Sequence, residues 1–204
     1  MNHFINRHSV TSGVVGALAL AASILPSAAA AAAPGGETLA NARNATAIYT
    51  DAGAAPAAGY ELLTDAAGIA CIDQAGEGAM GVHFVKGALV QSGTLDPARP
   101  QALVYEVGSS GRLELAALEY VVIQSAWDAG HSGPPTLFGQ KFMLNPADNR
   151  FGLPAFYSLH AWVWKHNPKG TFEPWNPDVH CANGSTANGA SPDEDSAPEP
   201  MPGM

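Results

Sequence analysis

Residues 102–123 read ALVYEVGSSGRLELAALEYVVI, and this stretch decides the fold. Two runs rich in aliphatic residues, 102–107 and 113–123, lie on either side of a short Ser-Ser-Gly segment. Strand-forming runs that are separated by a few turn-forming residues are typical of a β-hairpin. We therefore predict two antiparallel strands here, and the second is the clearest strand of the chain.

Similar runs occur on both sides of this hairpin. Residues 80–85 (MGVHFV) precede it, and residues 156–164 (FYSLHAWVW) follow it. The second run fits a helix or a strand by periodicity alone, but its aromatic residues favour a pleated surface. We predict strands at both places.

The segment 37–55 has a different composition, because it is rich in alanine. Four residues recur at the spacing of a helix face: Leu39, Ala42, Thr46 and Tyr49. This period predicts a single helix over 37–55 that ends at Pro56. The predicted fold class is therefore α+β, with an N-terminal helix packed on a mainly antiparallel sheet that could curl into a half-barrel. Residues 37–181, about 145 in number, have the usual size of one globular domain.

The N-terminus has the order of a secretory signal peptide. Arg7 is followed by an apolar run over 13–25 and by an alanine-rich segment that offers several A-x-A cleavage frames. The apolar run is shorter than the ~20 residues that a membrane-spanning helix needs. We predict that residues 1–33 are removed and that the protein is secreted or periplasmic, with no stable membrane insertion after cleavage. An uncleaved N-terminal anchor is the alternative.

The C-terminal segment 182–204 consists mostly of Asn, Gly, Ser, Ala, Asp, Glu and Pro. It has no apolar periodicity, so we predict a disordered acidic tail. The formal net charge of the full chain is −9, and basic residues do not cluster anywhere along it. Nucleic acids and anionic membrane surfaces both attract Lys/Arg patches, so neither is an expected partner.

The chain has two cysteines, Cys71 and Cys181. An exported protein meets an oxidising environment, so we predict that they form a disulfide. A loop of about 110 residues closed in this way would stabilise the fold by up to ~4–5 kcal/mol. The alternative is a pair of metal-binding thiolates, although the CxxC spacing typical of such sites is missing.

Glu119 is the most informative polar residue of the predicted hairpin. Alternate residues of a strand share a face. The odd-numbered face of 113–123 is mostly aliphatic and has Glu119 in its middle, whereas the even-numbered face begins with Arg112 and Glu114. We therefore predict that the odd face is buried. A buried carboxylate is costly unless it is paired, protonated or bound to a metal.

Three further ionisable residues lie inside apolar strand-like runs: His83, Glu106 and His160. If these strands surround one cavity, the three side chains converge with Glu119. Two imidazoles with one or two carboxylates suit a divalent transition metal such as Zn, Fe, Mn or Cu. We therefore predict an exported protein that binds a small ligand or a metal ion through these four residues.

Other interpretations of these residues stay open. The four side chains could make separate structural hydrogen bonds in a structural or interaction domain that has no small-molecule site. Glu119 and a histidine could also form the acid–base pair of an enzyme, with or without a metal. The sequence contains no HExxH, GxSxG or phosphate-binding loop that would favour a particular chemistry.

Several longer motifs resemble a group of small exported bacterial proteins. They are GAMGVHFV (78–85), LDPARPQALVYE (95–106), LEYVV (118–122), PPTLFGQKF (134–142) and LHAWVWKHNPKGTFEPWNPDVHC (159–181). The resemblance covers about residues 40–181. It implies export and a single domain, and it implies no particular activity.

Overall fold

The computed structural model describes residues 38–181. The predicted signal peptide (1–33) and the predicted acidic tail (182–204) lie outside the described residues. Among the residues that are described, no helix is both long and apolar enough to cross a bilayer.

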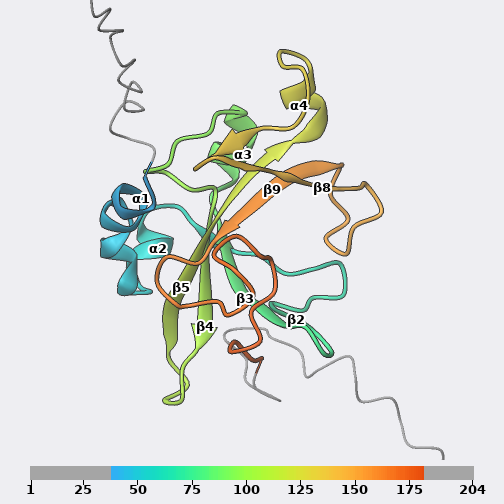
Figure 1. The fold of residues 1–204 in the computed structure, drawn as a ribbon. Coiled ribbons are helices and arrows are strands. Elements are labelled where there is room, and N and C mark those ends of the chain that lie inside the picture. The colour runs from blue at the N-terminus through green and yellow to red at the C-terminus, as the bar shows by residue number, and fades with distance from the viewer. Residues whose placement is uncertain (1–37, 182–204) are drawn as a thin grey trace, which may run out of the picture. The chain divides into compact units, whose positions relative to one another are not determined.

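A seven-stranded antiparallel sheet forms the framework of the described residues (Figure 1). Its main order is β1 (Glu61–Leu62), β3 (Gly78–Val85), β4 (Ala102–Val107), β5 (Leu113–Ile123), β9 (Phe156–Ala161) and β8 (Met143–Asn145). Strand β2 (Cys71–Gln74) also pairs with β3, and β6 (Thr136–Leu137) pairs with β7 (Gln140–Lys141) in a separate ladder. The α+β class and the antiparallel sheet are confirmed, and the sheet does not close on itself.

The hairpin of β4 and β5 has the predicted bounds. Gly111 closes the turn with a φ of 76°, a left-handed conformation that costs glycine little. The pairing shifts by one residue at Val104 and Tyr105, which face Ala117 and Leu115 and leave Ala116 unpaired. The carbonyl of Ala116 instead accepts hydrogen bonds from the segment that follows β9.

Both faces of β5 are covered, so Glu119 is buried as predicted, but the even-numbered residues of 116–122 are buried as well. The larger core lies on the face that carries Leu118, Tyr120 and Val122, which we call the core face. The opposite face, which we call the second face, carries Ala117 and Glu119 and is also buried. The bulge at Ala116 reverses the alternation, so Leu115 lies in the larger core although its number is odd. The strand therefore lies between two layers, and for this reason its apolar pattern alternates poorly.

The prediction of one helix over 37–55 is wrong. The segment forms α1 (Leu39–Ala45), a 3₁₀ turn (Ala47–Thr50) and α2 (Ala54–Ala57). The hydroxyl of Thr46 donates to the carbonyl of Ala42 at 2.8 Å, and the Asp51 carboxylate accepts from the amide of Gly53 at 3.1 Å. Such local side-chain bonds compete with a continuous helix. The pieces nevertheless pack on the core face, as predicted for the helix.

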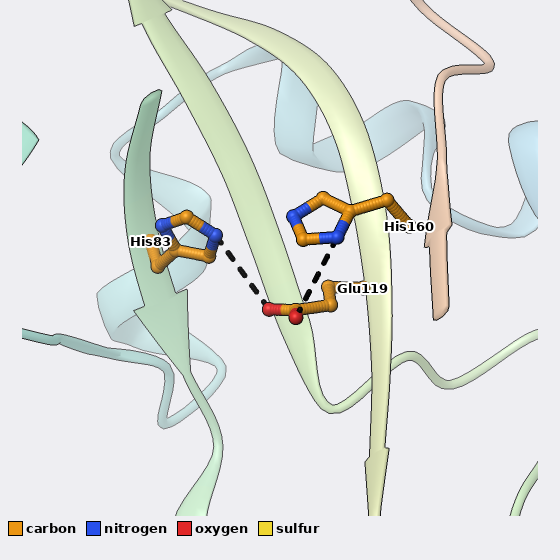
Figure 2. Close-up of side chains that lie close together, drawn as sticks. All are labelled: His83, Glu119 and His160. Atoms are coloured by element: carbon orange, nitrogen blue, oxygen red, sulfur yellow. Dashed lines mark ion pairs between the residues drawn. The ribbon is translucent and has the colours of Figure 1, made fainter. Parts of the chain in front are cut away.

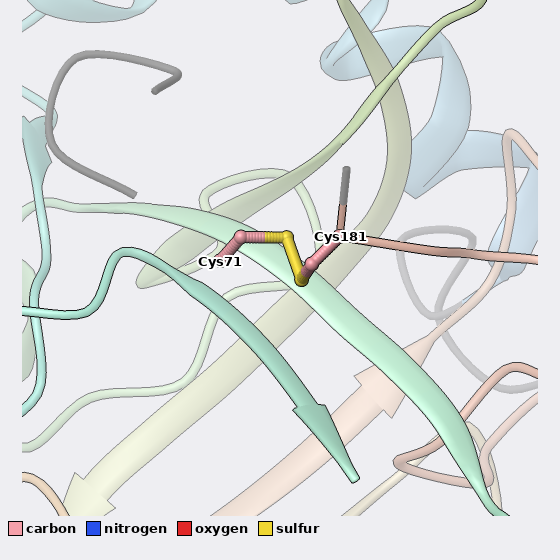
Figure 3. The surroundings of a disulfide bond; sticks show 2 residues. All are labelled: Cys71 and Cys181. Atoms are coloured by element: carbon pink, nitrogen blue, oxygen red, sulfur yellow. A yellow bond between two sulfur atoms is a disulfide. The ribbon is translucent and has the colours of Figure 1, made fainter. Parts of the chain in front are cut away.

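Two further short helices are α3 (Gly87–Ser92), which connects β3 towards β4, and α4 (Gln124–Asp128), which follows β5 directly. Figure 3 shows the predicted disulfide between Cys71 and Cys181, which is confirmed with a Cα–Cα distance of 5.7 Å. It joins β2 to the last described residue. The bridge therefore ties the C-terminal end of the described chain to the sheet.

Candidate metal site

Three of the four predicted residues converge on the second face of the sheet (Figure 2). Glu119 on β5 lies between His83 on β3 and His160 on β9. Glu119 pairs directly with His160 across β5 and β9, so their side chains start close together. Strand β4 lies between β3 and β5, so the side chains of His83 and Glu119 approach each other over the face of β4.

Strand β4 leaves room for this meeting because its residue beside Glu119 is small. Ala102 pairs with Glu119 on one side and with Val85 on the other, and it is fully buried. His83 is level with Val104, so the line from His83 to Glu119 runs diagonally over β4 between Val104 and Ala102, where a larger side chain at 102 would take up space. The alanine is therefore part of the geometry that forms the cluster.

The distances within the cluster fit a bound ion better than hydrogen bonds. His83 Nε2 lies 3.6 Å from Glu119 Oε2, and His160 Nδ1 lies 3.7 Å from Glu119 Oε1. A ligand atom of each of the three residues lies within 4.8 Å of those of the other two. Hydrogen bonds are shorter, at about 2.7–3.2 Å. Ligand atoms around a tetrahedral ion with bonds of about 2.0–2.1 Å are separated by roughly 3.3 Å.

Burial sets the charge of the cluster. The exposed fractions of His83, Glu119 and His160 are 2%, 9% and 3%. Burial lowers the pKa of each histidine to about 4, although the nearby Glu119 carboxylate opposes this for His83. Burial also raises the pKa of Glu119, against the attraction of His83. Both imidazoles are therefore neutral at pH 7, which is the form that binds metal ions.

The outer ring nitrogens of both histidines are buried without a regular hydrogen bond. His160 Nε2 makes no hydrogen bond to any group of residues 38–181. His83 Nδ1 has no hydrogen bond of normal geometry there, although the backbone of Gly81 raises the pKa of this ring slightly. A buried polar group left in this way costs about 1–3 kcal/mol. A histidine that binds a metal ion usually donates its other ring nitrogen to a second group. Neither outer nitrogen has a regular hydrogen bond to such a group among residues 38–181, so this feature does not distinguish a metal site from a structural role.

A short chain of hydrogen bonds supports the carboxylate of Glu119. The hydroxyl of Ser158 on β9 is hydrogen-bonded to Glu119 and favours its ionised form. Asn145 Nδ2 on β8 donates to Ser158 Oγ at 3.1 Å, which leaves the hydroxyl proton for Glu119. Sequence reasoning missed both residues. Ser158 could have been found by parity, because it precedes His160 by two residues in the same strand.

Glu106, the fourth predicted residue, lies apart from the cluster. It pairs with Glu114 near the end of the hairpin and accepts a hydrogen bond from Lys165 Nζ at 2.7 Å. Four residues along β4 separate it from Ala102, which is level with Glu119. At about 3.4 Å per residue this is roughly 14 Å, too far for a shared ion.

The remaining histidines of the described chain are on the surface. His131, His166 and His180 are all exposed. The ring of His131 stacks on Trp127 at 3.7 Å between ring centroids, outside the cluster.

A cavity of about 270 Å³ adjoins the cluster on the second face. His83, Glu119 and Ser158 border it, and most of its other lining is apolar. His160 borders a second cavity of about 230 Å³, which also contacts Lys141 and Glu173. The cluster therefore lies between two spaces that are large enough for water or a small ligand.

No family model matches this chain, and neither a curated protein nor a solved structure is detectably similar to it. The description of this protein therefore rests on its fold and its candidate site. It is an α+β protein with an antiparallel sheet, one disulfide and a buried cluster of two histidines and a glutamate.

Proposed function

We propose that this is an exported metal-binding protein in which His83, Glu119 and His160 hold one divalent transition metal ion. One observation carries the proposal: one ligand atom from each of three buried side chains lies within 4.8 Å of those of the other two. Each group comes from a different strand of a rigid sheet. Such a site is preorganised, so binding would require little rearrangement.

The donor set narrows the choice of ion. Two neutral imidazoles and one carboxylate suit Zn²⁺, Fe²⁺, Mn²⁺ or Cu²⁺, and they disfavour Ca²⁺ and Mg²⁺, which prefer oxygen ligands. Three protein ligands leave at least one coordination position open. Zn²⁺ is the first ion to test because the spacing of the donor atoms is close to that of a tetrahedral site.

Export is the second part of the proposal. The signal-peptide pattern of residues 1–33 supports it, together with the resemblance to small exported bacterial proteins. A disulfide between Cys71 and Cys181 is consistent with an oxidising compartment. Cell fractionation of an expressing bacterium tests this part, because a mature protein that begins near residue 34 should be found outside the cytoplasm.

An enzyme is the second candidate function, and the cavity is the observation that favours it. The cavity of about 270 Å³ reaches Glu119, so a substrate could approach the cluster. In that case Glu119 would transfer a proton, and a bound ion would polarise the substrate or water. Turnover of a substrate by the wild type but not by Glu119→Gln would favour this candidate.

Metal content tests the leading proposal. The full chain is expressed without a histidine tag, purified and equilibrated with Zn²⁺, and its bound zinc is measured by elemental analysis. We expect about one ion per chain for the wild type and for His131→Gln, which changes an exposed histidine. His83→Gln and His160→Gln should bind less than a tenth as much.

Thermal unfolding gives a second readout of binding. At a Zn²⁺ concentration 100 times Kd, the stabilisation is about 2.7 kcal/mol, or roughly 8 °C in Tm for a domain of this size. Chelation should remove the shift in the wild type and in His131→Gln. If none of the four metals binds stoichiometrically and none raises Tm, the protein is not a metal-binding protein of this kind.

A further inference from the structure

The cavity beside the cluster has one polar end and a long apolar remainder. His83, Glu119, Ser158 and Asn145 form the polar end, and Gln91 of α3 is the other polar side chain of the lining. Beyond the polar end the second face of the sheet continues with Val121 and Ile123, which also line the cavity. The distance along β5 from Glu119 to Ile123 is four residues, or about 14 Å. The cavity therefore offers an apolar track that starts at the proposed metal site.

Apolar side chains from outside the sheet complete the walls. They include Val90 of α3 and, from the segment between β8 and β9, Phe151 and Leu153. An apolar cavity of about 150 Å³ holds benzene, so a cavity of about 270 Å³ can hold a ligand nearly twice as large. The lining therefore suits a small molecule with an aliphatic or aromatic tail.

The rim of the cavity is preformed. The side chain of Asn149 accepts hydrogen bonds from the amides of Phe151 and Leu153 and donates to the carbonyl of Leu153. Arg150 in the same segment forms an ion pair with Asp65 at 2.8 Å. Leu153 is nevertheless 37% exposed. A rigid segment that holds a large apolar side chain at the mouth of a cavity is suited to contact a ligand.

The charge of the polar end decides the head group of that ligand. No Lys or Arg is among the residues that line the cavity, and Glu119 is its only acid. A divalent ion with one carboxylate ligand carries a net charge of about +1, and its field is strong in an apolar surrounding. The filled site would therefore attract an anion, whereas the empty site would not.

We propose that the cavity binds a small organic carboxylate with an apolar tail, whose head group takes an open coordination position of the ion at His83, Glu119 and His160. The inference rests on the proposed metal-binding function. The tail lies along Val121 and Ile123, and Val90 and Leu153 cover it.

Calorimetry with octanoate tests this proposal on the full-length protein loaded with Zn²⁺. Octanoate should bind at least about 100-fold more tightly than acetate, because each added methylene is buried. Octanoate should also bind at least about tenfold more tightly than 1-octanol, which lacks the charge, and chelation of the metal should abolish this preference.

Two substitutions in the wall separate binding in the cavity from binding elsewhere. Val90→Phe narrows the cavity and Leu153→Ala removes part of its cover, and each should weaken octanoate binding at least about fivefold. Neither should change zinc content. Ile48→Phe is the control, because Ile48 is exposed and outside the cavity, and it should have no effect.

The outcomes distinguish the two proposals. If zinc binds but octanoate is no tighter than acetate, the carboxylate proposal is overturned and the metal site stands. Equal binding of octanoate and octanol, or equal octanoate binding with and without metal, also overturns it. If no metal binds at all, both proposals fail.

Discussion

At the scale of single residues, the ionisation of His83 and His160 couples folding to pH. The pKa of each histidine is about 4 in the folded protein and about 6.5 when it is exposed. The unfolded chain therefore binds more protons between these values, so the histidines destabilise the metal-free protein as the pH falls from 6.5 towards 4. The raised pKa of Glu119 acts in the opposite sense above its usual value of 4.5, since burial of its charge costs stability as the pH rises.

This coupling gives the first prediction. Urea unfolding of the metal-free protein should show the free energy of unfolding falling as the pH is lowered from 6.5 to 4.5. Each histidine contributes at most about 1.4 kcal/mol per pH unit. His160→Gln should flatten the dependence, and His131→Gln should not. A slope that is the same in both variants would show that His160 is not buried in its neutral form.

Ser158 allows a second prediction at this scale. Its hydroxyl supports the ionised carboxylate of Glu119, and residues that orient metal ligands typically contribute 10–100-fold to affinity. Ser158→Ala should weaken zinc binding about tenfold with little loss of folded protein, as measured by competition with a chromophoric chelator. Ser92→Ala, at an exposed position, is the control. An unchanged zinc affinity of Ser158→Ala would show that Ser158 does not support Glu119 as a metal ligand.

At the scale of secondary-structure elements, strand β4 lies between the strands that carry His83 and Glu119. Its small residue Ala102 leaves space for these two side chains to approach each other. Ala102→Leu should fill the space between them and lower zinc affinity at least about tenfold. Overpacking a buried position also costs about 1–3 kcal/mol of stability. Ala98→Leu is the control, because Ala98 is exposed. A folded Ala102→Leu protein with unchanged zinc affinity would contradict the role of this strand.

The four longest strands could be predicted from the sequence, because apolar runs bounded by turn residues define them locally. The short strands β1, β2, β6, β7 and β8 were missed, because two to four residues give no such run. The bounds of β4 and β5 agree with prediction, and β3 and β9 are close to it. The broken helix could not be predicted in this way. The spacing of Thr46 fits the apolar face of a helix. Its hydroxyl nevertheless bonds to the carbonyl of Ala42, and this bond competes with a continuous helix.

The cluster could be predicted in part. His83, Glu119 and His160 were identifiable as ionisable residues inside apolar strands, and the parity of β5 pointed to Glu119. The alternation of residues along a strand predicts on which face a side chain lies. It does not predict which side chains of neighbouring strands lie level with one another. The register of the strands decides this, and it separates Glu106 from the other three.

At the scale of the whole molecule, the disulfide and the cluster join different parts of the described fold. The bridge joins β2 to the segment after β9, whereas the cluster joins β3, β5 and β9. Replacing both Cys71 and Cys181 by Ala should lower the free energy of unfolding by up to about 4–5 kcal/mol. Zinc content at 15 °C should remain about one ion per chain. Loss of zinc from a variant that is still folded would show that the bridge shapes the site.

X-ray absorption at the zinc edge tests the central claim most directly, on untagged full-length protein loaded with one equivalent of Zn²⁺. We expect two imidazole nitrogens and a carboxylate oxygen at about 2.0–2.2 Å from the zinc ion, with room for one further light ligand. Because His83→Gln and His160→Gln should hold less than a tenth as much zinc, the imidazole signal should be almost lost in both variants and should stay unchanged in His131→Gln. A spectrum without imidazole ligands, or one that neither cluster variant alters, would contradict the account.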